Sequence, residues 1–306
     1  MYSEGMTRVA TIERKKPANS RTSVRRNDLL QPFLKWAGGK RQLVPEIRKY
    51  VPHKFKLYFE PFVGAGAVLF DLQPQAALIN DANEELVNCY RVIKKDPEGL
   101  IAHARQHRNT KEYFYSLRSL DREPGFKSLS ALERASRIIF LNKTCYNGLF
   151  RVNSQGQFNV PFGKYTNPVI VDEIVIRAVS RFFNEARVEV SNEDFEVALS
   201  GAGRGDFVYL DPPYDPLSDT SSFTGYNLNS FGRNEQQRLQ RVCDDLTRRG
   251  CKVLLSNSAT EFIRDLYSDT TRYTIVEVEA NRNINSVGTS RGKISELLIF
   301  NNNNAV

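Results

Sequence analysis

The fold is decided by the stretch Leu57-Tyr58-Phe59-Glu60-Pro61-Phe62-Val63-Gly64-Ala65-Gly66. Its apolar first half, residues 57–62, has the length and composition of a buried strand. Its second half is a turn in which Gly64 and Gly66 let the backbone pass close to a ligand. A strand that ends in such a turn is typical of a parallel sheet whose ligands bind at the carboxyl edge. By itself, a Gly-x-Gly turn is also compatible with an ordinary loop.

On both sides of this stretch, short apolar runs of strand length alternate with longer amphipathic runs of helix length. This alternation predicts an α/β protein with a mostly parallel, Rossmann-like sheet and helices on both of its faces. The predicted strands are residues 57–62, 76–80, 186–190, 207–210, 252–256, 274–279 and 297–300.

The alternation stops between Pro97 and Pro168, where helical stretches such as 132–143 are followed by a segment rich in Gly, Asn and aromatic residues. We predict an inserted, largely helical subdomain over residues 97–168. It divides a main domain into residues 32–96 and 169–301. Because the insertion falls between sheet strands, we expect it to project from the edge where ligands bind.

The two ends of the chain are polar. Residues 1–31 are rich in Arg, Lys, Ser, Thr and Asn and predict a flexible basic arm. Asn301 to Asn304 belong to a polar tail, which as a separate segment covers residues 302–306.

The composition restricts the possible classes of protein. The 306 residues allow one large α/β core with a smaller subdomain, and the net charge of +8 fits either a nucleic-acid partner or a solubilising surface. Four scattered cysteines without a CxxC pair argue against a zinc site and a disulfide framework. His103 and His107 can share a helix face, but no third ligand is near, so we expect a solvated or capping role and no metal. Without a membrane span or a signal peptide, we expect a cytoplasmic protein.

An acidic residue, Asp81, ends the second predicted strand. At about 20 residues after a glycine turn, a carboxylate can accept hydrogen bonds from both hydroxyls of a ribose. No third glycine completes a dinucleotide fingerprint. A single-nucleoside ligand therefore fits better than NAD.

The strongest functional signal is Asp211-Pro212-Pro213-Tyr214, directly after the apolar run 207–210. The prolines fix two φ angles and carry no amide hydrogen, so the Pro212 carbonyl and the Asp211 carboxylate can face one point as paired acceptors. This pair suits an exocyclic amino group, whose lone pair becomes nucleophilic when both N–H bonds are held in a near-tetrahedral arrangement. Tyr214 offers a flat face on which an extruded base can stack. The alternative is a plain proline-fixed turn.

A third motif, Lys35-Trp36-Ala37-Gly38-Gly39-Lys40, precedes the first predicted strand. Trp36 and Lys40 can contact a ligand that carries a purine and a carboxylate, by stacking and by charge. Without the other motifs, it is equally a basic turn before a helix that begins near Arg41.

In this order, the three motifs resemble those of the Dam-type, D12-class DNA adenine-N6 methyltransferases. The similarity runs from about Leu30 to Phe300 and includes residues 146–151, 158–163 and 216–218. It implies an S-adenosylmethionine-dependent methyltransferase sheet with an inserted target-recognition subdomain. The implied activity is methyl transfer to N6 of an adenine that is flipped out of a duplex.

The resemblance also implies S-adenosylmethionine as the cofactor and double-stranded DNA as the partner. It places Asp81 on the ribose hydroxyls and the pair Asp194-Phe195 beside the cofactor's adenine. The residues that it places at the cofactor are Trp36, Lys40, Phe62, Gly64, Gly66, Asp81, Asp194, Phe195 and Asp211. Those that match the catalytic tetrapeptide are Asp211, Pro212, Pro213 and Tyr214.

Members of the family that carry these motifs in the insert recognise the DNA sequence GATC. By resemblance, Arg151 reads a guanine edge and Lys35 reaches the other guanine, Tyr146 wedges between bases, and Leu149 and Pro161 meet a thymine. The predicted DNA-binding residues are Lys35, Tyr146, Asn147, Leu149, Arg151, Pro161, Arg291 and Lys293. The last two, with Arg282, belong to a loop that we expect to grip phosphates, although a solvated hairpin loop is the alternative. From the residues alone, four aromatic side chains are predicted to be ordinary core residues: Tyr146, Phe150, Phe158 and Phe162.

Two other functions stay open. The tetrapeptide would serve any planar amino group, so an amino methyltransferase for RNA or for a free nucleoside is one alternative, and an insert that reads a duplex argues against it. A DNA-binding regulator without catalysis is the other, and the complete tetrapeptide and cofactor turn argue against it. The sequence leaves open whether the enzyme works alone or beside a cognate restriction endonuclease encoded nearby.

Overall fold

The computed structural model describes residues 26–36, 38–216, 231–281 and 293–302. The expectations for several other parts of the chain lie outside these residues: the arm up to residue 25, Leu217 and Ser218, Arg282 and Arg291, the side chain of Lys293, and the tail after Asn302. In the part of the chain that is described, no helix has the length and apolar character that a membrane crossing requires.

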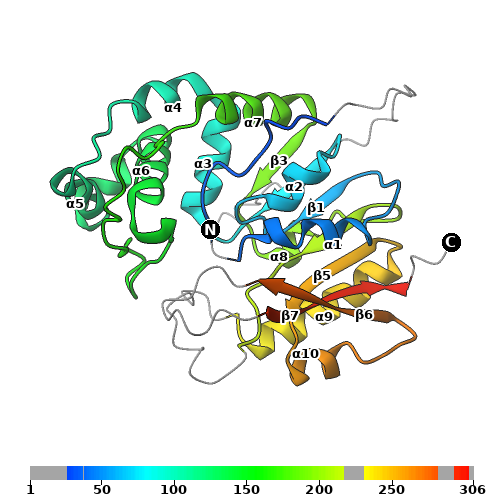
Figure 1. The fold of residues 1–306 in the computed structure, drawn as a ribbon. Helices are drawn as coiled ribbons and strands as arrows, with labels where there is room; N and C mark the ends of the chain where they lie inside the picture. Colours follow the sequence, from blue (N-terminus) through cyan, green and yellow to red (C-terminus); the bar gives the residue numbers. More distant parts are fainter. Residues whose placement is uncertain (1–25, 37, 217–230, 282–292, 303–306) are drawn as a thin grey trace, which may run out of the picture.

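A seven-stranded sheet with the order β3-β2-β1-β4-β5-β7-β6 forms the centre of the protein (Figure 1). Every strand pair is parallel except the two made by β7, which runs antiparallel to β5 and β6. The strands are β1 (Tyr58–Glu60), β2 (Ala77–Asn80), β3 (Val188–Ser191), β4 (Phe207–Leu210), β5 (Lys252–Ser258), β6 (Tyr273–Asn281) and β7 (Lys293–Asn301). Each of the seven predicted runs forms a strand, and the predicted mostly parallel sheet is confirmed.

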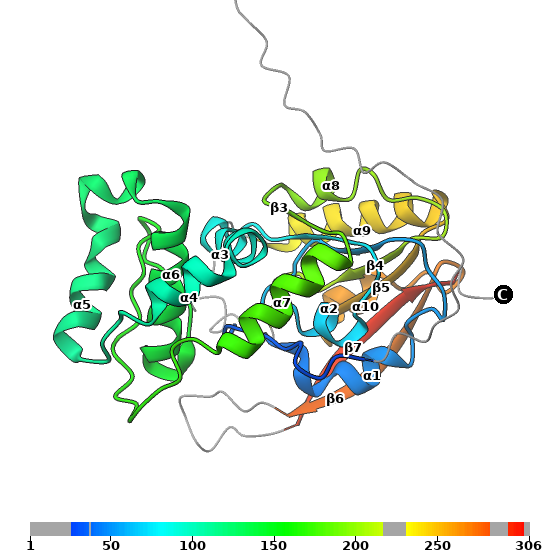
Figure 2. The same cartoon turned by 90° about the horizontal axis from the view of Figure 1, so that it is seen from above.

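Helices cover both faces of the sheet, as predicted, because alternate side chains of the central strands enter two separate cores. In β4, Tyr209 enters the first core, whereas Val208 and Leu210 enter the second. The first core is covered by α1 (Val44–Arg48), α2 (Ala67–Leu72), α3 (Glu84–Lys95) and α7 (Glu173–Glu185), and the second by α8 (Phe195–Ala198), α9 (Arg233–Arg248) and α10 (Glu261–Leu266). Figure 2 shows α8 and α9 on the opposite side of the sheet from α2 and α7.

The segment that interrupts the strand pattern is helical up to Gly148. It contains α4 (Pro97–Ala104), α5 (Lys111–Ser119), α6 (Ala131–Thr144) and the short 3-10 turns η2 (Leu120–Arg122), η3 (Pro124–Ser128) and η4 (Tyr146–Gly148). A capping box between Ser130 and Glu133 begins α6. Figures 1 and 2 show α4, α5 and α6 to one side of the sheet, with α3 between them and the strands. Phe140 of α6 is in the same apolar core as Leu69 of α2, so this segment has no separate core.

Two polar residues and one short segment differ from their sequence-based expectations. His107 is buried rather than solvated, and it is hydrogen-bonded to Tyr113 Oη at 2.8 Å and to Ser136 Oγ at 2.8 Å. Asn301 is the buried end of β7 rather than part of a tail, because its side chain bonds the Val253 amide and the Cys251 carbonyl. Residues 26–31 are attached to the core by an Arg26–Asp71 ion pair and the buried Leu30.

One buried amide connects the segment before β1 to α6. Asn142 Oδ1 accepts from the Lys35 amide at 2.9 Å, and Asn142 Nδ2 donates to the carbonyls of Lys35 at 2.8 Å and Gly148 at 3.0 Å. A buried amide with three partners is costly to remove, since each backbone group left behind loses its hydrogen bond.

We therefore expect Asn142→Ala to lower the free energy of unfolding by about 2–4 kcal/mol, measured by urea denaturation. Asn88→Ala is the matched control, because that side chain makes one exposed hydrogen bond to the Ala131 carbonyl. Its loss should cost less than about 1 kcal/mol. Equal losses in the two variants would contradict the role of Asn142.

Candidate active site

The Asp-Pro-Pro-Tyr turn follows β4 directly, at the carboxyl edge of the sheet. All four residues of β4 are buried, and the strand lies between β1 and β5. Gln236 of α9 donates to the Pro213 carbonyl at 2.8 Å, and Ser258 Oγ donates to the Asp215 carbonyl at 2.7 Å. The turn is therefore fixed from both neighbouring elements. Among the described residues, no hydrogen bond uses the Pro212 carbonyl, which is next to Asp211 in the turn.

Lys40 brings the third motif to this turn. Its side chain comes from η1 (Lys40–Gln42), is 8 % exposed, and places Nζ 2.9 Å from Asp211 Oδ1 and 3.0 Å from the Gly38 carbonyl. The same ammonium lies 4.5 Å from the centroid of the Tyr214 ring, a cation–π distance. Tyr214 Oη in turn donates to Glu296 Oε2 of β7 at 2.7 Å.

The carboxyl group of Asp211 titrates close to neutrality. Burial raises its pKa to about 6, and the charge of Glu296 adds to the rise, whereas Lys40 and the Tyr214 hydroxyl oppose it. Burial also raises the pKa of Glu60, at the end of β1, well above its ordinary value. With a pKa of about 6, Asp211 is largely ionised at physiological pH.

The glycine turn after β1 is connected to the other motifs. Gly64 N donates to Asp81 Oδ2 at 3.0 Å, and Tyr90 Oη of α3 donates to the Gly64 carbonyl at 2.9 Å. Gly64 has φ +49°, and a Cβ there would lie 3.2 Å from Trp36 Cδ1. The Trp36 ring therefore lies against a turn that only glycine fits well.

A group of aromatic rings lies near the turn on the other side of the sheet. Phe62 packs on Phe195 with ring centroids 5.5 Å apart, and both rings contact Phe231. The guanidinium of Arg238 stacks 4.3 Å above the Phe195 ring and pairs with Asp194. Two of the predicted cofactor contacts, Phe62 and Phe195, are thus adjacent, and Asp194 has an ion-pair partner.

The insert meets the cofactor motifs at two points. Trp36 stacks on Phe150 at 4.7 Å with 24° between the rings. A Cβ on Gly148, which has φ +64°, would lie 2.3 Å from Lys35 Cδ, so the Lys35 side chain crosses the turn directly. The Lys35 ammonium lies 5.3 Å from the Tyr165 ring centroid.

The predicted base-reading residues share one segment of the insert. Tyr146 is 50 % exposed, and its amide donates to the Pro161 carbonyl at 2.8 Å. Asn147 is exposed with φ +55°, Leu149 is partly buried, and Arg151 Nε donates to Asn159 Oδ1 at 2.7 Å. Phe150 and Phe158 are buried core rings, as the residues alone allowed. Tyr146 is not.

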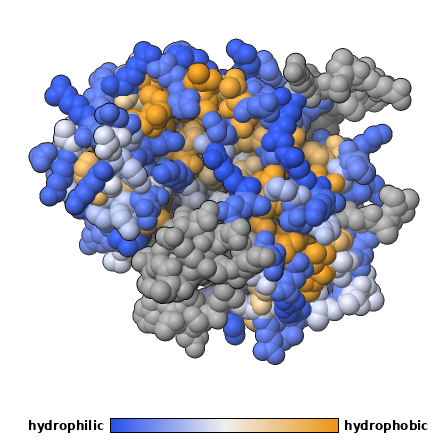
Figure 3. Space-filling view, in the orientation of Figure 1, coloured by the Kyte–Doolittle hydropathy of each residue, from blue (hydrophilic) through white to orange (hydrophobic). Residues whose placement is uncertain are grey.

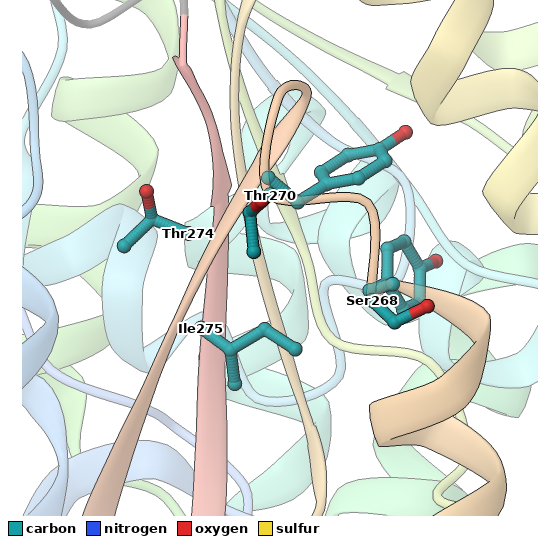
Figure 4. Close-up of a pocket in the computed structure, with 6 residues that line it drawn as sticks. Ser268, Thr270, Thr274 and Ile275 are labelled. Carbon is teal, nitrogen blue, oxygen red and sulfur yellow. The ribbon is translucent and has the colours of Figure 1, made fainter.

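Two surface hollows lie apart from these contacts. One, of about 310 Å³, is between α10 and β6, with Ser268, Thr270, Thr274 and Ile275 around it (Figure 4). None of the motif residues lines it. A second, of about 480 Å³, is lined by Pro216, Arg233 and Thr260 among others, and begins two residues after Tyr214.

Exposed apolar side chains also lie away from the three motifs. In the face shown in Figure 3, an apolar area lies over α4 and α7, and the surface over α5 is mostly hydrophilic. Val169 and Ile174, just before and within α7, are 68 % and 62 % exposed. Among the described residues, no group of three His, Cys, Asp or Glu side chains is arranged to hold a metal ion.

Sequence reasoning missed Tyr90, Asn142 and Glu296. Tyr90 and Asn142 lie within amphipathic helices and look like ordinary helix positions. A signal existed for Glu296, which is the one acidic residue in the run Lys293-Ile-Ser-Glu-Leu-Leu-Ile-Phe-Asn301. Glu296 is on the same face of β7 as Leu298, which lies in the first core. An acidic side chain next to an apolar core needs a polar partner.

The sheet, the glycine turn and the turn after β4 together define an α/β methyltransferase fold. Residues 36–284 match the family model of the D12 class N6 adenine-specific DNA methyltransferase. A type II methyltransferase of Lactococcus lactis subsp. cremoris is 46 % identical over 90 % of this chain and 96 % of its own length. A type II methyltransferase of Methanocaldococcus jannaschii is 41 % identical (89 % and 99 %), and the DNA adenine methylase of Escherichia coli K12 is 35 % identical (87 % and 93 %). The chain belongs to the D12 class of N6 adenine-specific DNA methyltransferases.

The pKa of Asp211 makes a pH dependence testable. The ionised carboxylate is a stronger hydrogen-bond acceptor than the protonated acid, so we expect the rate of methyl transfer to fall by half near pH 6 as the pH decreases. Initial rates between about pH 5 and pH 8.5, with circular dichroism to confirm folding, would measure it. A rate that stays constant down to about pH 4.5 would contradict this assignment.

Proposed function

We propose that this DNA adenine methyltransferase transfers the methyl group of S-adenosylmethionine to N6 of an adenine flipped out of duplex DNA, within GATC. The observation that carries the proposal is the pair of acceptors after β4: the Asp211 carboxylate and the Pro212 carbonyl, to which no described residue donates a hydrogen bond. A base inside a duplex cannot reach a buried turn, so an enzyme of this kind must extrude its target.

The residues at the glycine turn fit S-adenosylmethionine. Asp81 keeps acceptor capacity after its bonds to the Gly64 and Asn83 amides, because a carboxylate has about four lone-pair sites. A ribose can use the remaining sites. Trp36 and Phe62 offer ring surface on two sides of the turn. When bound, the cofactor supplies an electrophilic methyl group on a positively charged sulfur.

The chain's own groups would prepare the adenine amine. The Asp211 carboxylate and the Pro212 carbonyl would each accept a hydrogen bond from one of the two N–H groups of the amine. They would thereby direct the nitrogen lone pair toward the methyl carbon. Tyr214 would stack on the extruded base, an interaction worth about 1–3 kcal/mol. As the new N–C bond forms and the bond between the sulfur and the methyl carbon breaks, the amine would lose one proton to the Asp211 carboxylate that accepts its hydrogen bond.

Recognition of GATC rests on the insert. Arg151 uses Nε for Asn159, and its exposed guanidinium still offers donors for a guanine edge. Tyr146 is exposed enough to enter a base step, and Lys35 lies next to the same segment. The type II names of two relatives favour a partner endonuclease for this chain too, which the neighbouring genes would test.

Methyl transfer itself provides the first test. We expect labelled methyl to pass from S-adenosylmethionine to a GATC-containing duplex and not to RNA of the same sequence. Asp211→Ala should abolish transfer, because one of the two acceptors is lost, and should leave the circular dichroism spectrum unchanged. Labelled RNA with unlabelled duplex would contradict the substrate, and a fully active Asp211→Ala variant would contradict the mechanism.

Specificity provides the second test. Arg151→Ala should reduce discrimination against a duplex in which the contacted guanine is replaced by roughly tenfold or more, since a bidentate contact is worth about 1–3 kcal/mol. The measurement is the ratio of kcat/KM on the two duplexes. Arg177→Ala, which removes an exposed arginine of α7 paired with Glu98, is the matched control. An unchanged ratio in Arg151→Ala would remove this residue from the recognition set.

A further inference from the structure

A carboxylate that no sequence motif marks lies beside the catalytic turn. Glu296 is in β7, and its Cα pairs with Ser258 of β5 and Val278 of β6. Its Oε2 accepts the hydrogen bond from Tyr214 Oη at 2.7 Å. The two residues are 82 positions apart, so the contact exists only because β7 lies next to β5 in the sheet.

The proton of the Tyr214 hydroxyl has two possible acceptors. Burial raises the pKa of Tyr214 well above its ordinary value, and the charges of Asp211 and Glu296 add to the rise, so the phenol stays a donor. The hydroxyl is also near enough to Asp211 to lower the pKa of that carboxyl. A phenol has one proton to give, and the geometry gives it to Glu296.

The choice between these acceptors affects the amine site. Asp211 already accepts from Lys40 at 2.9 Å. If the phenol also donated to Asp211, fewer acceptor sites would remain for an N–H group, and the carboxylate would be a weaker acceptor.

We propose that Glu296 is a positioning residue for methyl transfer: it holds the hydroxyl of Tyr214 and so keeps the proton of that hydroxyl away from Asp211. This inference rests on the function proposed above for the same site. Glu296 acts through Tyr214, and the contact fixes both the direction of the phenol and the plane of the ring.

The charged or titratable neighbours of Asp211 among the described residues bear on the test. Lys40 faces it from η1, Tyr58 and Glu60 from β1 and Tyr209 from β4, besides Tyr214 and Glu296. Burial raises the pKa values of Tyr58, Glu60 and Tyr209 well above their ordinary values. Loss of the Glu296 charge removes one negative group that opposes ionisation of Asp211.

A double-mutant cycle tests the inference at about pH 8, where Asp211 is ionised. Glu296→Ala should lower kcat by roughly ten- to a hundredfold, because the phenol then donates to Asp211. In the Tyr214→Phe background, which keeps the ring and has no proton to donate, the same change should have no effect on kcat. Equal losses in both backgrounds would overturn the inference, and so would a fully active Glu296→Ala variant.

The conservative variant separates position from charge. Glu296→Gln keeps an oxygen acceptor for the phenol, so most of the activity should remain, with the acid limb of the kcat/KM profile moved to lower pH. A loss as large as that of Glu296→Ala would overturn the inference. Glu277→Ala is the matched control, since that carboxylate is on β6 and pairs with Arg264 at the surface. It should change kcat by less than about twofold.

Circular dichroism and cofactor binding, measured by calorimetry, should be the same in all of these variants and the wild type. A wild-type protein that leaves duplex DNA unmethylated would overturn the proposed function. An active wild type with any of the overturning results above would reject only the role of Glu296.

Discussion

A carboxylate held at the end of a buried strand organises this protein. Asp211 is 18 % exposed, and a charge in such a place costs several kcal/mol unless it is paired. The pair comes from Lys40, which precedes β1 in the sequence and contacts Asp211 across the carboxyl edge of the sheet. The ion pair is one of the contacts that hold the segment before β1 over that edge, together with the hydrogen bonds from Asn142 to the Lys35 backbone. Trp36, four residues before Lys40, lies against the glycine turn.

The helical insert is part of the same structural unit. Its helix α6 contributes to the core that covers one face of the sheet. Asn142 of this helix accepts a hydrogen bond from the Lys35 amide and donates one to the Lys35 carbonyl. The ring of Phe150 stacks on Trp36. The segment after α6 is thus joined to the segment before β1 through direct contacts.

Much of this arrangement could be predicted from the sequence. Buried strands of a parallel sheet are short apolar runs, and each of the seven runs forms a strand. The carboxyl ends of parallel strands share one edge, which explains why the turns after β1 and β4 meet. The errors concern polar side chains. His107 and Asn301 are buried because their partners come from distant segments, and local polarity does not reveal such partners.

By itself, the sequence determined the α/β class, the strands, the three motifs and the resemblance to adenine methyltransferases, because these depend on residue types at short spacings. Only the tertiary structure decided which polar groups are partners: Lys40 with Asp211, and Tyr214 with Glu296. It also decided that burial raises the pKa of Asp211 to about 6. Hydrogen bonds and desolvation act over a few ångströms between segments far apart in the chain, so they exist only after the sheet has brought those segments together.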